Sequence, residues 1–231
     1  MALALLAACS PDYTGVRDWA FTATGVVEAG ARATEDDPAA TAFRQATVTY
    51  LGALSTLAMD GLLEHETDPL AGAAATAGAS DSAGGAAIAT LGELLLRSSR
   101  QLARAPQLRE TIAEGDPPFQ AMVAAFGRAL ARLDEADAAL LASLRASHQI
   151  ERQRIRDVAT RAAMADLLSA REAEVQHRLA RRQAEREALV RIAGMHAVMA
   201  EQRSVLAQSD MRRRLLAADV VLRRYMPPML P

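Results

Sequence analysis

The 231 residues are enough for one sizeable hydrophobic core, and 51% of them are hydrophobic although only 3% are aromatic. Alanine and leucine lead the apolar residues and favour helices over strands, so we expect an all-α fold. The formal net charge of −2 argues against a nucleic-acid binder, which relies on an excess of positive charge.

The chain begins MALALLAACS, where a short apolar run leads to two small residues and the single cysteine, Cys9. The sequence LAAC at residues 6–9 resembles the lipobox of bacterial lipoproteins. That resemblance implies that residues 1–8 are the remnant of a signal, that Cys9 is lipidated, and that Ser10 directs sorting to the outer membrane, facing the periplasm. Lipidation would also account for a lone cysteine in an oxidising compartment, where an unpaired thiol is reactive. The alternative is a cytoplasmic protein with one reduced thiol.

Residues 9–37 contain proline and glycine interruptions and are predicted to be a lipid-anchored tether whose Trp19 and Phe21 dock onto the body. Asp37 followed by Pro38 is typical of a helix start, since aspartate caps the first turn and proline is tolerated at its first position. We therefore expect a single helical domain over residues 38–231. Its predicted helices cover about residues 38–66, 86–114, 117–168 and 170–225.

Between Pro118 and Pro227 the chain has no proline, and one continuous helix over this stretch would be implausibly long for a small domain. The sequence SARE at residues 169–172 matches a capping box and predicts a turn there. The two arms have charged faces and a thin apolar seam, as an antiparallel coiled coil requires. We expect an antiparallel four-helix body with two long helices projecting as a coiled-coil hairpin. A single rod that pairs between chains is the alternative.

The motifs of common catalytic and metal sites are missing from the sequence. Glu174 and His177 have the E-x-x-H spacing of di-metal bundles, but such sites need a second copy of the motif and two further carboxylates. We therefore predict no catalytic residue, no metal and no cofactor. An enzyme or metal-binding bundle with a site inside the body stays the alternative.

These patterns favour a non-catalytic binding or scaffolding module of the cell envelope. Its expected partners are an unknown envelope protein, the membrane through the lipid anchor, and a second copy of the chain, with no nucleic acid. The candidate partner surface on the hairpin consists of Arg152, Arg156, Arg161, Arg171, Glu174, Arg178 and Arg182. A candidate basic patch near the C-terminus consists of Arg212, Arg213, Arg214, Arg223 and Arg224.

Overall fold

The computed structural model describes residues 11–100 and 104–226, and within these ranges it contains seven α-helices and no strand. The predicted all-α fold is confirmed. The helices are α1 (Thr14–Ala29), α2 (Pro38–Ala58), α3 (Ala71–Gly78), α4 (Ser82–Ser99), α5 (Arg104–Arg154), α6 (Val158–Glu201) and α7 (Ser209–Leu222). Three short 3-10 helices accompany them, η1 (Ala31–Ala33), η2 (Arg203–Val205) and η3 (Arg223–Tyr225).

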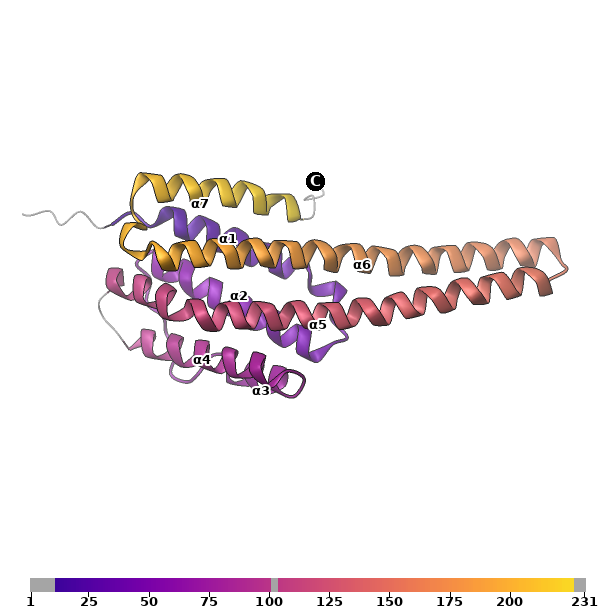
Figure 1. Cartoon of the computed structure of the whole chain (residues 1–231), viewed down its shortest axis with the longest axis horizontal. Helices are drawn as coiled ribbons and strands as arrows, with labels where there is room; N and C mark the ends of the chain where they lie inside the picture. The colour runs from indigo at the N-terminus through magenta and orange to yellow at the C-terminus, as the bar shows by residue number, and fades with distance from the viewer. Residues whose placement is uncertain (1–10, 101–103, 227–231) are drawn as a thin grey trace, which may run out of the picture.

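The body consists of the shorter helices packed around the proximal halves of α5 and α6 (Figure 1). Helix α2 packs against α1, α3 and α5, and α4 packs against α3 and α5. Helix α7 returns along α1 on the other side of the body. The described chain begins, next to α1, at the end of the body that lies away from the hairpin.

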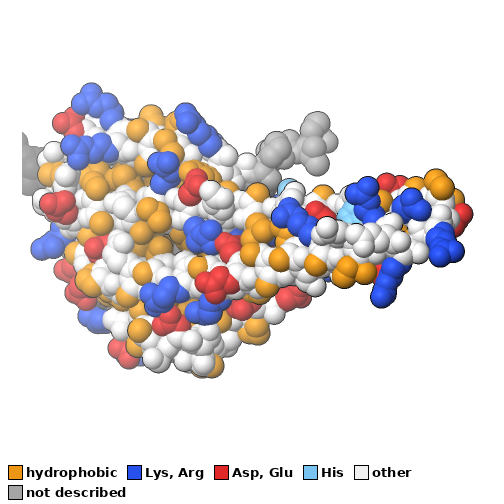
Figure 2. Space-filling model, turned by 45° about the vertical axis from the view of Figure 1, so that its right-hand side comes forward, with side chains coloured by type: hydrophobic (Ala, Val, Ile, Leu, Met, Phe, Trp, Pro, Cys, Tyr) orange, Lys and Arg blue, Asp and Glu red, His pale blue; other side chains and the backbone are white. Residues whose placement is uncertain are grey.

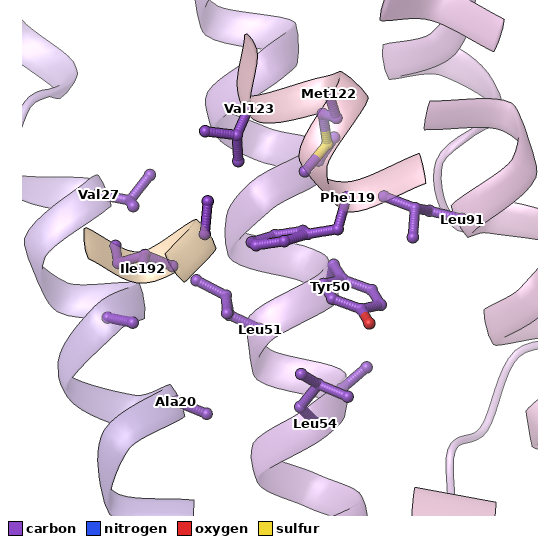
Figure 3. Close-up of a cluster of buried hydrophobic side chains, with 14 of the residues drawn as sticks. Ala20, Val27, Tyr50, Leu51, Leu54, Leu91, Phe119, Met122, Val123 and Ile192 are labelled. Atoms are coloured by element: carbon purple, nitrogen blue, oxygen red, sulfur yellow. The ribbon is translucent and has the colours of Figure 1, made fainter. Parts of the chain in front are cut away.

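All seven α-helices contribute to the main hydrophobic core. Figure 3 shows Tyr50 of α2 beside Phe119 of α5, and the centroids of the two rings are 5.1 Å apart. Side chains of α1, α4 and α6 close the cluster around them. The fully buried members include Ala20, Leu51, Leu54, Leu91, Met122 and Ile192. Because so few aromatic residues are available, alanine and leucine fill most of this core.

The distal parts of α5 and α6 project from this body as an antiparallel hairpin (Figure 1). No residue from 131 to 174 is buried, whereas Leu130 and Val175, on either side of this stretch, are. From residue 137 to the end of α5 at residue 154, the arm extends roughly 25 Å at the rise of an α-helix. The hairpin is therefore a two-helix arm with solvent on most of its surface.

The turn of the hairpin lies at residues 155–157 and not at residues 169–172, which are part of α6. The carboxylate of Asp157 caps α6 by accepting a hydrogen bond from the backbone N–H of Thr160 at 2.7 Å. The guanidinium of Arg161 donates to the carbonyl oxygen of Ile155 at 2.7 and 2.9 Å, which satisfies a carbonyl group at the end of α5. These side chains make a tight turn without glycine or proline.

Several other predicted boundaries also differ from the structure. Helix α2 ends at Ala58, where Asp60 adopts a left-handed conformation with φ of 57°. Helix α5 begins at Arg104 and continues through Pro117 and Pro118, at which we expected a new helix to start. The last expected helix is two helices, α6 and α7, and the chain reverses between them at residues 202–208.

The segment expected to be a tether contains α1, which is part of the body. Trp19 is fully buried, as predicted, whereas Phe21 points to solvent with 73% of its surface exposed. The predicted role of Phe21 in docking is therefore wrong.

Candidate functional site

The hairpin is fixed where it leaves the body by a set of ion pairs between α5 and α6. Arg178 donates to Asp137 at 2.6 Å, and Arg182 donates to Asp134 at 2.8 Å and also to Asp137. Arg186 also donates a hydrogen bond to Asp134. The hydrogen bond from Arg178 lowers the pKa of Asp137, against the opposing effect of partial burial. Both carboxylates form ion pairs with arginines of α6.

A buried ion pair joins the same part of α6 to α2. Arg44 donates to Glu185 at 2.5 Å and to the carbonyl oxygen of Val27 in α1 at 3.1 Å, and it also contacts the hydroxyl of Thr34. Arg44 and Glu185 are both almost completely buried. Burial raises the pKa of Glu185, although the neighbouring Arg44 opposes this shift. This pair connects three helices at the base of the hairpin, and sequence patterns did not single it out.

The predicted partner surface divides between the base and the distal half of the hairpin. Arg182 is only 2% exposed and Arg178 is paired with Asp137, so both belong to the base. Arg171 pairs with Glu174 at 2.5 Å, and Glu174 also pairs with Arg178 at 3.2 Å. Arg178 and Arg182 thus pair across the two arms, whereas the pair of Arg171 and Glu174 is exposed and lies within α6.

The remaining members of that surface lie at the turn of the hairpin or next to it. Arg152 and Arg156 are exposed, and Arg154 between them is exposed as well, although the sequence reasoning did not include it. Arg161 is occupied in the turn by the carbonyl oxygen of Ile155. Arg161 in the turn, and Arg178 and Arg182 at the base, thus differ in role from the exposed arginines of the tip.

A polar cleft of about 540 Å³ lies between the arms near the tip. Four of its lining side chains, Arg145, His148, Gln149 and Arg152, follow one face of α5, and Glu172 faces them from α6. Arg145 donates to Glu172 at 3.4 Å. Two arginines against one carboxylate leave the cleft with an excess of positive charge.

Large apolar side chains are exposed among these charges. Val158 at the start of α6 is 75% exposed, and Ile150 near the end of α5 is 52% exposed. Figure 2 shows blue basic side chains at the distal end of the hairpin, together with orange hydrophobic ones and some red acidic ones. The tip, which we define as residues 150–158, is therefore basic and partly apolar.

The predicted basic patch of α7 and η3 is largely neutralised by neighbouring carboxylates. Arg212 pairs with Asp12 at 3.0 Å, Arg213 with Asp210 at 2.7 Å and Arg223 with Asp219 at 2.8 Å. Arg214 and Arg224 are exposed. Three of the five arginines that were expected to form one cationic surface thus lie in separate local pairs.

A buried polar chain inside the body was also missed by sequence analysis. The ring nitrogen Nε2 of His196 in α6 forms a hydrogen bond with the hydroxyl of Tyr50 at 2.9 Å. The other ring nitrogen, Nδ1, lies 2.8 Å from the carboxylate of Asp116. Burial raises the pKa of Tyr50 and lowers that of His196, while the hydrogen bond from His196 lowers the pKa of Asp116. Tyr50 and His196 are fully buried, whereas the Asp116 carboxylate is 23% exposed, and this chain connects α2, α5 and α6.

The remaining chemical expectations concern metals, membranes and the lipobox. Glu174 is engaged by two arginines and His177 is exposed, and the described residues contain no group of three or more side chains suited to hold a metal ion. None of the described helices is long and apolar enough to cross a membrane. Cys9 and the LAAC sequence lie outside the described residues.

No protein-family model, curated protein or solved structure matches the chain.

Proposed function

We propose that the protein is a non-catalytic binding or scaffolding module of the cell envelope that engages its partner through the distal half of the hairpin. The observation that carries this proposal is the contrast between the two ends of the hairpin. The base is fixed by buried and partly buried ion pairs, while the distal half exposes arginines and apolar side chains to solvent.

A fixed base supports a binding role because it holds the projecting surface in a defined orientation. Less freedom is then lost on binding, which favours affinity. The exposed side chains of the tip do not contribute to the core of the body, since no residue from 131 to 174 is buried. Their exposure is more easily explained by a contact with another molecule than by the stability of the domain.

Attachment through Cys9 is the second part of the proposal. The lipobox resemblance places the lipid near the described N-terminus, and α1 begins at the end of the body away from the hairpin (Figure 1). An anchored protein would therefore present the hairpin away from the membrane that holds it. The proposed location is the outer membrane, facing the periplasm.

Excision of residues 142–174 tests the role of the hairpin. The pairs Asp137–Arg178 and Arg145–Glu172 set the register of the arms and place residues 141 and 175 opposite each other, so a short glycine-containing turn can join them. The excised protein should keep its cooperative thermal unfolding and lose retention by an isolated envelope fraction. Retention equal to that of the intact chain would show that the hairpin is not the binding element.

A further inference from the structure

We propose that the tip of the hairpin, residues 150–158, binds a membrane surface that contains anionic phospholipids. This inference rests on the proposed function and names the partner of the same site. It follows from the charge of the tip, from its exposed apolar side chains and from its small area.

The charge of the tip is opposite to that of the whole chain. Residues 150–158 contain three arginines and two carboxylates, Glu151 and Asp157, whereas the chain as a whole has a formal net charge of −2. Arg152, Arg154 and Arg156 are all exposed near the turn. Of the two carboxylates, Asp157 is held by the start of α6 as its cap. A negatively charged surface would therefore attract the tip and not the body.

The apolar side chains of the tip are placed beside these arginines. Val158 follows the turn directly and is 75% exposed, and Ile150 is 52% exposed one turn before the end of α5. Exposed aliphatic groups flanked by arginine are suited to the boundary between lipid headgroups and acyl chains. The long arginine side chains can keep their guanidinium groups among the phosphates while the aliphatic groups enter the boundary.

The area of the tip favours a lipid surface over a protein. An α-helix with its side chains is about 10–12 Å wide, so the end of a two-helix hairpin presents on the order of 250 Å². A stable protein interface buries about 800 Å² on each partner. A bilayer does not require this area or a complementary shape, because its headgroups rearrange around charged and apolar side chains.

The cleft beside the tip provides further hydrogen-bond donors for an anionic headgroup. Arg145, His148, Gln149 and Arg152 line it on one face of α5. Since arginine forms charge-assisted hydrogen bonds with phosphate oxygens, a headgroup at the edge of the cleft would meet several donors at once. If lipid on Cys9 anchors the end of the body where the described chain begins, the tip would contact a second membrane surface.

The test measures binding of the full chain to two kinds of vesicle, phosphatidylcholine alone and phosphatidylcholine with about 30% phosphatidylglycerol. We expect salt-sensitive binding to the anionic vesicles only. The variant Arg152→Gln, Arg154→Gln, Arg156→Gln should reduce the partition coefficient on the order of a hundredfold, at about fivefold for each arginine. The variant Ile150→Ser, Val158→Ser should also weaken binding, by less.

The matched control removes three arginines from the body, as Arg212→Gln, Arg213→Gln, Arg214→Gln, and should leave the partition coefficient unchanged. Equal losses in the two triple variants would overturn the inference, because net charge and not the tip would then determine binding. Absence of vesicle binding, with envelope retention still lost on excision of residues 142–174, would show a protein partner and leave the proposed function standing. Envelope retention after that excision would instead refute the proposed function.

Discussion

The guanidinium of Arg44 on α2 lies 2.5 Å from the carboxylate of Glu185 on α6, and both side chains are almost completely buried. This contact joins the body to the helix that becomes one arm of the hairpin. The carboxylate of Glu185 also lies directly against Gly30, where any side chain would overlap it. The orientation of the hairpin therefore depends on a charge pair that water does not screen.

Loss of one partner of this pair should be costly. Arg44→Ala would leave the Glu185 carboxylate buried without its counter-charge, and we expect the free energy of unfolding to fall by about 3–5 kcal/mol. The double variant Arg44→Met, Glu185→Leu removes both charges and should recover much of that loss. Urea unfolding of the three proteins measures these differences.

The exposed pair of Arg97 and Glu114, 2.9 Å apart, serves as the control for this experiment. Because both side chains are more than half exposed, Arg97→Ala should change the free energy of unfolding by less than about 1 kcal/mol. Equal losses from Arg44→Ala and Arg97→Ala would contradict the role that we assign to the buried pair.

The stability of the body should decrease in mild acid because of His196. Burial lowers the pKa of this histidine below its ordinary value of 6.5, although Asp116 opposes the shift. Below that pH the unfolded chain binds a proton that the folded protein excludes, so the free energy of unfolding falls as the pH drops from about 6.5 towards the folded pKa.

The variant His196→Gln isolates this effect, since its amide can still meet Tyr50 and Asp116 but does not titrate. Its free energy of unfolding should vary less between pH 7 and pH 5 than that of the wild type, with denaturant unfolding at each pH as the measurement. Glu185 titrates in both proteins and cancels in the comparison. Parallel curves for the two proteins would refute the assignment to His196.

Replacing two helical glycines by alanine should change the stability of the protein in opposite directions. A methyl group at Gly85 of α4 would overlap the backbone of Gly78 in α3, so Gly85→Ala should destabilise the protein. Gly127 of α5 has open space at the same position, and Gly127→Ala should stabilise it by about 0.5–1 kcal/mol through the higher helix propensity of alanine. Thermal unfolding of the two variants and the wild type measures these changes. A stabilising effect of Gly85→Ala would contradict the close packing of α3 on α4.

Lipidation of Cys9 can be read directly from an intact mass. The protein expressed in a bacterial host with its native upstream sequence should have the mass of a chain cleaved before Cys9, plus glyceride and acyl groups. The variant Cys9→Ala should lack these additions. An unmodified full-length wild-type mass with a free thiol would remove the basis for the envelope location.

The sequence was sufficient to predict helices and a hairpin, because alanine, leucine and the spacing of apolar residues report local structure. The position of the turn could not be predicted from the capping-box pattern at residues 169–172. In the structure Glu172 faces Arg145 on the other arm. The turn is made by local contacts, of Asp157 with Thr160 and of Arg161 with Ile155, which the capping-box pattern did not include.

Glycine and proline were misleading for a related reason. Gly15 suggested an irregular tether, but it lies in α1 where α7 approaches closely, since a side chain there would come within 3.3 Å of Leu215. Pro117 and Pro118 suggested a helix start, whereas the adjacent Phe119 and Asp116 are held by His196 inside the body. The partners of Arg44, Arg182 and His196 lie far away in sequence, so local patterns contain no signal for them.

Amide hydrogen exchange of the full chain, with and without the isolated envelope fraction, tests the central claim most directly. If the distal hairpin is the binding element, slower exchange in the presence of the envelope should be confined to peptides that cover residues 142–174. Exchange in α1 and α7 should stay unchanged. Protection of α1 or α7 with no change in the hairpin would contradict the account and place the binding surface on the body.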